Sequence, residues 1–230
     1  MKQDFIYSKL FKNIYLGVII TILFFAFIIP LTNQSFQNEM CYFTNQSNFL
    51  IFIFSIFLVF ANLFVNDNKN NFMKTTSFTI LWLCLTHIIL VTMVIFCFFL
   101  LPMGVIFNAE SFKMHMDFYS IITHVIAPLL FISYFYIYSK KQLLEFNDAF
   151  FCLIYPSIYF CLVNLRVFLN VENLIGENSP YPHFFFDPNF NNQGYLPIVF
   201  YIIILMLLFY FLGFFLIKNY IKISKKELNI

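Results

Sequence analysis

Six long apolar segments alternate with polar connections along this chain of 230 residues. A helix that crosses a membrane needs about 20 mostly apolar residues, and each segment is close to that length. The connections are short, except for the one between the fifth and sixth segments. The pattern therefore predicts an all-α integral membrane protein, a single domain over residues 1–230 in which six transmembrane helices form a bundle. We expect the helices at about Asn13–Leu31, Thr44–Val65, Thr76–Leu101, Phe118–Tyr138, Ala149–Asn170 and Tyr195–Ile217.

The composition agrees with this fold class. Hydrophobic residues make up 61% of the chain and charged residues only 10%, whereas a soluble domain carries about 25% charged residues. Four cysteines lie inside apolar segments, where they are expected to act as small hydrophobic residues, and the chain has no C-x-x-C motif. We expect no nucleic-acid partner, no metal and no organic cofactor.

The positive charges predict how the helices cross the membrane. Eleven of the 13 lysines and arginines lie in the two terminal segments and in the second and fourth connections, and only Lys113 and Arg166 lie on the other side. Positively charged connections stay in the cytoplasm. We therefore expect a protein of the cell membrane with both termini cytoplasmic and with the first, third and fifth connections outside.

The fifth connection, Val171–Gly194, differs from the others in length and in charge. It contains acidic residues but no Lys or Arg, and it carries the sequence Ser179-Pro180-Tyr181-Pro182-His183 followed by Asp187-Pro188. A residue that precedes proline favours an extended backbone. We therefore expect this loop to be stiff and to pack over the outer end of the bundle.

Five consecutive hydrogen-bonding side chains, residues 44–48, stand just before the apolar part of the second helix. If the helix starts near Tyr42, then Thr44, Ser47 and Asn48 share one face. A helix cap needs one or two such residues, so this run indicates a functional site. We expect Asn45 and Gln46 to face water at the helix end.

Ionisable side chains at membrane depth are costly and mark candidate functional positions. His124 lies about 9 Å below the outer surface, at 1.5 Å per residue. Pro128 has no N–H to bond the carbonyl of His124, so we expect a bend there, with a free carbonyl beside the imidazole. His87, in the middle of the third helix, is expected to have a structural role.

Arg166 lies about one turn from the outer end of the fifth helix. Its guanidinium keeps its charge, so it must reach the membrane surface or an acceptor. Three roles remain open: an interfacial anchor, an anchor for an anionic substrate group, and a partner for Asp187 or Glu172.

These polar residues share one predicted depth, and acyl transfer is the chemistry that suits them. A Thr hydroxyl becomes a good nucleophile when a neighbouring base takes its proton, and a buried imidazole stays neutral and can act as that base. We expect Thr44 as nucleophile, with Ser47 as its competitor, and His124 as base. Asn48, Asn45 or Arg166 would stabilise the oxyanion.

Three motifs resemble a known family. Tyr42-Phe43-Thr44-x-x-Ser47-Asn48, Thr123-His124-x-x-x-Pro128-Leu129, and Tyr181-Pro182 with Asp187 before the last helix are similar to the androgen-induced-gene-one and androgen-dependent TFPI-regulating protein family, and closer to its bacterial, mollicute-like branch. The resemblance implies a six-helix intramembrane hydrolase of lipid esters, such as fatty acid esters of hydroxy fatty acids. Carried over by motif, it makes Thr44 the nucleophile and His124 the base, with Tyr181 and Asp187 near the substrate.

Two other interpretations remain open. The chain could be a non-enzymatic multi-pass subunit that binds or transports a small molecule, and co-purification with an ATPase module would favour that function. It could also be a structural membrane protein whose outer polar residues only close the bundle. A zinc site built from His115, His183 and Asp187 is disfavoured, because these residues lie in separate loops without metal-type spacing.

Overall fold

Six helices of the computed structural model are long and apolar enough to cross a membrane. The structure describes residues 8–32, 40–64, 75–97, 118–139, 144–169, 179–183, 186–189 and 194–228. Two of the six crossings are composite: the fourth contains a π-helical turn, η3, and the fifth begins as a 3-10 helix, η4. The predicted all-α, six-span membrane bundle is therefore confirmed. The elements are α2 (Lys9–Thr32), α4 (Phe43–Phe64), α5 (Thr76–Ile95), α8 (Phe118–Ile121), η3 (Ile122–Ile126), α9 (Ala127–Tyr138), η4 (Phe146–Leu153), α10 (Ile154–Phe168) and α11 (Tyr195–Leu228).

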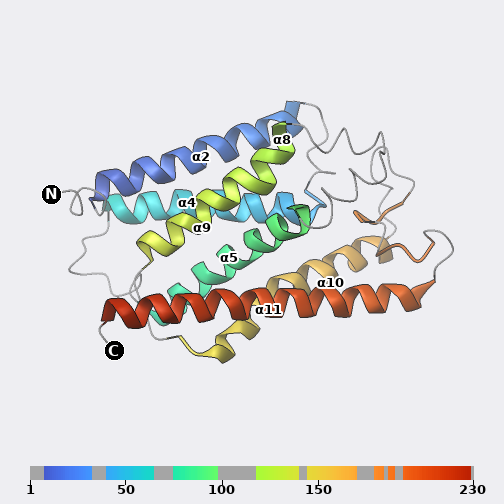
Figure 1. Cartoon of the computed structure of the whole chain (residues 1–230). Helices are drawn as coiled ribbons and strands as arrows, with labels where there is room; N and C mark the ends of the chain where they lie inside the picture. The colour runs from blue at the N-terminus through green and yellow to red at the C-terminus, as the bar shows by residue number, and fades with distance from the viewer. Residues whose placement is uncertain are drawn as a thin grey trace.

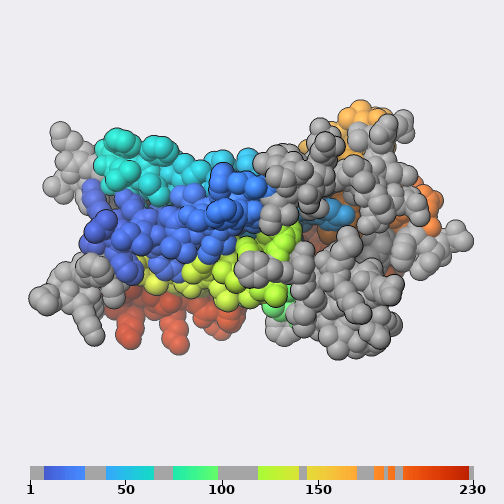
Figure 2. Space-filling view, turned by 90° about the horizontal axis from the view of Figure 1, so that it is seen from above, coloured from blue at the N-terminus to red at the C-terminus, as the bar shows by residue number. Residues whose placement is uncertain are grey.

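The helices run side by side along one long axis, and α2 begins at the end of the bundle where α11 ends (Figure 1). The opposite end, where α4 begins and α10 ends, is called the Thr44 end below. On the face seen in Figure 2, α2 lies between α4 and α9, and it packs against both. The Thr44 end holds the first turn of α4, the π-helical turn η3 and the described parts of the α10–α11 loop.

The centre of the bundle is α5, which is the most buried of the six membrane-crossing helices and packs against α4, α9 and α11. Its Trp82 ring lies 5.9 Å from Phe54, 5.6 Å from Tyr134 and 5.7 Å from Phe135, between ring centroids. Pairs at this separation have the tilted and edge-to-face geometries that aromatic rings favour. A second, smaller cluster lies toward the Thr44 end and contains Phe43, Ile88, Val91, Tyr159, Val163, Phe186 and Phe209.

Several polar side chains inside the bundle bond to other helices, where water is not available as a partner. The Asn62 amide on α4 donates to Asn13 on α2 over 3.0 Å, and the Tyr15 hydroxyl donates to the carbonyl of Leu130 over 3.2 Å. His87 is fully buried and its Nε2 lies 2.7 Å from the carbonyl oxygen of Phe209 on α11. This bond between α5 and α11 agrees with the structural role expected for His87.

Several helix boundaries differ from the predicted ones, and each difference has a local cause. Helix α2 starts at Lys9 instead of Asn13, because the Ser8 hydroxyl accepts the N–H of Phe11 and caps the helix. The last helix continues to Leu228 instead of ending near Ile217, since no Gly or Pro interrupts the lysine-containing segment that follows. Hydropathy located the apolar parts of these helices but not their ends.

The fifth crossing also starts earlier than predicted, at Phe146 instead of Ala149, as the 3-10 helix η4. Pro156 then occupies the third position of α10. Because α10 continues directly from η4, the N–H that Pro156 lacks is one that would have bonded a carbonyl at the end of the 3-10 helix. The predicted end of the third helix, Leu101, lies outside the described residues.

Gly213 is the point of closest approach between α11 and the fifth crossing. A Cβ atom placed there would lie 3.0 Å from Cβ and 3.1 Å from Sγ of Cys152. Gly17 on α2, in contrast, has open space around the same position. The absence of a side chain at residue 213 therefore allows α11 and η4 to pack as closely as they do.

We expect Gly213→Ala to be less stable than Gly17→Ala by about 1–3 kcal/mol, the usual cost of overpacking. Both substitutions gain the same helix propensity, about 1 kcal/mol, so the difference isolates the contact with Cys152. Thermal unfolding of both variants in one detergent measures it. Equal midpoints would show that η4 can move away from α11 without cost.

Candidate functional site

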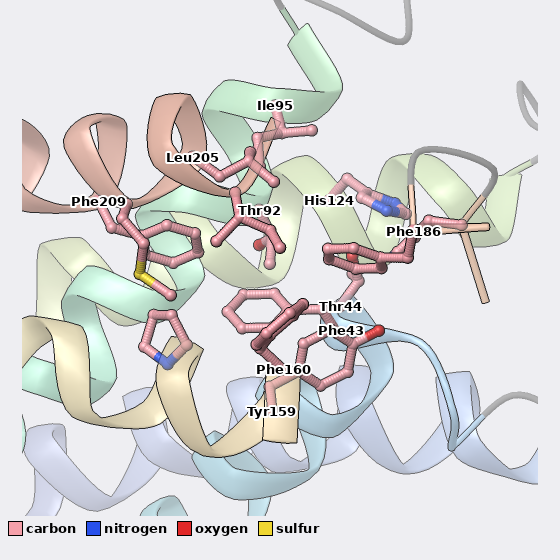
Figure 3. A pocket seen from close by; sticks show the side chains of 14 residues that line it. Phe43, Thr44, Thr92, Ile95, His124, Tyr159, Phe160, Phe186, Leu205 and Phe209 are labelled. Atoms are coloured by element: carbon pink, nitrogen blue, oxygen red, sulfur yellow. The ribbon is translucent and has the colours of Figure 1, made fainter. Parts of the chain in front are cut away.

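A cavity of about 120 Å³ lies at the Thr44 end, between α4, α5, η3, α10, α11 and the α10–α11 loop. Figure 3 shows Thr44 and His124 among the side chains around it, with Phe186 reaching in from the loop. Most of the surface is apolar. The lining residues are Phe43, Thr44, Thr92, Ile95, His124, Pro156, Tyr159, Phe160, His183, Phe186, Ile202, Leu205, Met206 and Phe209.

His124 lies in the π-helical turn that precedes Pro128. In this turn the N–H of Ala127 bonds the carbonyl of Ile122, so the backbone widens by one residue where proline removes a donor. A π-helical turn of this kind often occurs at a functional site. The predicted disturbance by Pro128 therefore takes the form of a wide turn inside a continuous helix.

Two contacts fix the His124 ring. Its Nδ1 lies 3.0 Å from the carbonyl oxygen of Ser120 and 3.1 Å from the hydroxyl of Thr123. A carbonyl oxygen can only accept, so Nδ1 carries the hydrogen in this bond and Nε2 carries the lone pair. The ring also stacks on Phe96, with centroids 4.5 Å apart. The ring is thus held in one orientation, and in its neutral form the basic nitrogen is Nε2.

Thr44 differs from the other hydroxyl-bearing residues that line the cavity. The Thr92 hydroxyl donates to the carbonyl of Ile89, and the Tyr159 hydroxyl donates to the carbonyl of Cys41. Thr44 is the second residue of α4, and the Met40 carbonyl four residues earlier accepts the Gln46 amide. Among the described residues, no group forms a hydrogen bond with the Thr44 hydroxyl. Its proton is therefore available to an incoming group.

Thr44 and His124 share the cavity but are not hydrogen-bonded to each other. Catalytic pairs are often separated before substrate binds and close up in the complex. The arrangement therefore places a hydroxyl and an imidazole around the same small cavity.

Asn48 ties the two halves of the site together. It is buried, and its Nδ2 donates over 3.0 Å to the carbonyl of Thr44 and over 3.1 Å to the carbonyl of Thr123. Both amide hydrogens are used in these bonds, so the side chain has none left for an oxyanion. The geometry supports a positioning role for Asn48 in place of the expected oxyanion role.

The other members of the polar run point away from the cavity. The Ser47 hydroxyl is buried and donates to the carbonyl of Phe43 over 2.6 Å, which disfavours it as a nucleophile. Asn45 is buried and accepts from the Tyr119 hydroxyl. Gln46 accepts from the Tyr155 hydroxyl on α10. The expectation that Asn45 and Gln46 face water is wrong for Asn45, which is buried. Gln46 is half-buried, and both residues link α4 to neighbouring helices.

Three predicted site residues do not line the cavity and instead make contacts in or with the α10–α11 loop: Arg166, Tyr181 and Asp187. The Arg166 guanidinium donates to the carbonyl of Pro180 over 2.6 Å. Asp187 is buried, and its Oδ1 accepts the N–H of Asn189 over 2.8 Å. Burial raises the pKa of Tyr181, whose ring packs against the smaller core cluster. Glu172, a predicted partner of Arg166, lies outside the described residues.

His183 is a polar lining residue that the sequence did not select for the catalytic site. It is half-buried, with its ring centroid 5.7 Å from Tyr42 and 6.1 Å from Phe186. This burial lowers its pKa to about 4, so the ring is neutral at pH 7. One feature of the sequence could have pointed to His183: it follows Pro182 in the loop that was expected to pack over the bundle.

Within the described residues, no three His, Cys, Asp or Glu side chains lie close enough to hold a metal ion. Residue His115, part of the disfavoured zinc interpretation, lies outside them. No protein-family model, curated protein or solved structure matches the chain. The similarity to the androgen-induced-gene-one family therefore stays a prediction that depends on the three motifs.

The two bonds of Asn48 predict a measurable loss of stability. We expect Asn48→Leu, which keeps the volume, to lower the free energy of unfolding by about 1–2 kcal/mol, because the buried carbonyl of Thr123 loses its donor on α4. Asn164→Leu is the matched control: its amide makes the same bond to the carbonyl four residues earlier, Phe160, but on an exposed face and to no other helix. Thermal unfolding of the two variants compares them. Equal losses would mean that the link to η3 contributes nothing.

Proposed function

We propose that this protein is a membrane-embedded hydrolase or acyltransferase of lipid esters, with Thr44 as nucleophile and His124 as general base. The observation that carries the proposal is the pairing of an uncommitted hydroxyl with an imidazole of fixed tautomer in one apolar cavity. A hydroxyl needs such a base to become nucleophilic. An acyl chain needs the apolar wall.

The proposed reaction follows from these groups. The Thr44 oxygen attacks the ester carbonyl carbon while His124 Nε2 takes the hydroxyl proton. The oxyanion then collapses, the bond to the alcohol oxygen breaks, and His124 returns the proton to the leaving alcohol. Water, or a second alcohol in an acyl transfer, repeats the sequence on the acyl-Thr44 intermediate and restores the free hydroxyl.

The positive charges suggest where the reaction occurs. Lys218, Lys222, Lys225 and Lys226 lie on the last part of α11, at the end of the bundle opposite Thr44. Cytoplasmic segments are the positively charged ones. We therefore place both termini in the cytoplasm, the protein in the cell membrane and the cavity near the outer leaflet, where membrane lipids supply the ester.

The cavity also fits the alternative function, in which the protein only binds a small apolar molecule. Its surface is mostly apolar and the α10–α11 loop covers it. Binding alone, however, does not require a hydroxyl without a partner in the same cavity as a fixed imidazole. This contrast makes the two functions separable by mutation.

We expect the purified protein to hydrolyse a p-nitrophenyl acyl ester in detergent, and Thr44→Ala and His124→Ala each to lower kcat at least about 100-fold, as loss of a nucleophile or a base does. Ser47→Ala is the matched control in the same helix turn and should keep the wild-type rate. A fluorophosphonate probe should label the wild type and not Thr44→Ala.

Hydrolysis or labelling that is unchanged in both Thr44→Ala and His124→Ala would refute the assignment. If the wild type shows no hydrolysis but retains a lipid or a co-purifying ATPase, the binding or transport function is the correct one.

A further inference from the structure

The size of the cavity limits which part of an ester it can hold. Its volume is about 120 Å³, whereas an engineered apolar cavity of about 150 Å³ binds one benzene molecule. In the same proportion, the cavity holds about five carbon atoms. The acyl chain of a membrane lipid is much longer, because it reaches across half of a hydrocarbon core about 30 Å thick. The cavity therefore accommodates a short chain and not a whole lipid tail.

The walls of the cavity are held by contacts that resist expansion. The Phe43 ring packs against the rings of Tyr159 and Phe209, with centroids 5.1 Å and 5.5 Å apart. The Tyr159 hydroxyl donates to the carbonyl of Cys41 over 3.0 Å, and the carbonyl oxygen of Phe209 lies 2.7 Å from Nε2 of His87. Closely packed interiors have low compressibility. A longer chain therefore cannot make room for itself by moving one ring.

The reactive groups and the closed end of the cavity lie on different sides. Figure 3 shows His124 and Phe209 on opposite sides, with the Thr44 side chain toward His124. The Phe209 ring is 5.7 Å from the ring of His87, between centroids, and His87 belongs to the middle part of α5. A chain that starts at the Thr44 hydroxyl therefore extends toward the centre of the bundle and ends against Phe209.

The acyl part of an ester suits this space better than the alcohol part. In the proposed reaction the acyl group stays bonded to the Thr44 oxygen until a second nucleophile removes it, whereas the alcohol leaves first. The α10–α11 loop covers the cavity with Phe186, which favours the group that stays. The hydroxyl protons of Thr92 and Tyr159 are bonded to backbone carbonyls, so these two side chains offer no donor to a polar alcohol.

We propose that the protein selects esters with a short acyl chain, of about four or five carbon atoms, and that Leu205 on α11 limits the length of this chain. The inference depends on the proposed hydrolase function. Leu205 lines the cavity and packs against the smaller core cluster, but it is only half-buried. Its side chain can therefore be changed without removing a ring from the centre of the bundle. The alcohol part, which carries the lipid, stays outside the cavity.

A series of p-nitrophenyl esters from acetate to octanoate tests the chain length. We expect kcat/KM of the purified protein to be highest for butyrate or pentanoate and at least about 10-fold lower for octanoate, since methylene groups that do not fit a pocket reduce it by such factors. Leu205→Ala replaces an isobutyl group with a methyl group and enlarges the cavity. The ratio of kcat/KM for hexanoate to that for butyrate should then rise at least about 10-fold.

Two further variants control this experiment. Leu196→Ala is the same substitution on α11 at an exposed position outside the cavity, and it should keep the wild-type profile. Leu205→Phe fills the cavity and should move the maximum toward acetate, which provides a second test if Leu205→Ala unfolds. The rate of Thr44→Ala with each ester is subtracted as background, because short esters also hydrolyse without the enzyme.

The outcomes distinguish this inference from the proposed function. A profile that rises to octanoate, with Thr44→Ala inactive, would overturn the short-chain selectivity and leave the hydrolase intact. A short-chain profile that is the same in the wild type, Leu205→Ala and Leu205→Phe would overturn the role of Leu205. If no ester in the series is hydrolysed in a manner that depends on Thr44, the function and the inference are overturned together.

Discussion

At the Thr44 end, the amide side chain of Asn48 connects the first turn of α4 to the π-helical turn η3. Its single nitrogen lies about 3 Å from the carbonyl oxygens of both Thr44 and Thr123, one on each side of the cavity. Inside a membrane no water can replace such a donor. The bond fixes the first turn of α4 relative to the π-helical turn, and the relative position of the hydroxyl of Thr44 and the imidazole of His124 follows from it. The local backbone around Pro128 matters for the same reason, since the wide turn presents the carbonyl of Thr123 to Asn48.

The crossings themselves could be predicted from the sequence, because twenty apolar residues in a row have few alternatives. The fourth crossing, Phe118–Tyr138, has the expected bounds. The ends of α2 and α11 could not be found from hydropathy, since a serine cap and a lysine-containing extension continue a helix without adding apolar residues. Pro128 predicted a disturbance in the helix, but only the packed structure decides that it becomes a π-helical turn.

The sequence predicted that Thr44 and His124 share a site, but it predicted the contacts of the neighbouring residues less well. Their residue types and their predicted depth in the membrane indicated that Thr44 and His124 lie together, and both line the cavity. They could not show that Asn48 donates both amide hydrogens to backbone carbonyls, that the Ser47 hydroxyl donates to the carbonyl of Phe43, or that Arg166 donates to a loop carbonyl. Such assignments depend on which acceptor lies nearest in three dimensions. His183 was missed although Tyr181 and Asp187 of the same loop were selected, because the motif that pointed to the loop contains those two residues and not His183.

The two faces of α11 have a consequence for how a molecule reaches the cavity. Ile202, Leu205, Met206 and Phe209 line it, while Ile203, Ile204 and Leu207 on the same turns are exposed on the outside of the bundle. In a bilayer those exposed side chains touch acyl chains. The boundary between the membrane interior and the cavity is therefore a single helix, about 10 Å across. A lipid would travel only that distance sideways, past flexible apolar side chains, and would never have to leave the hydrocarbon phase.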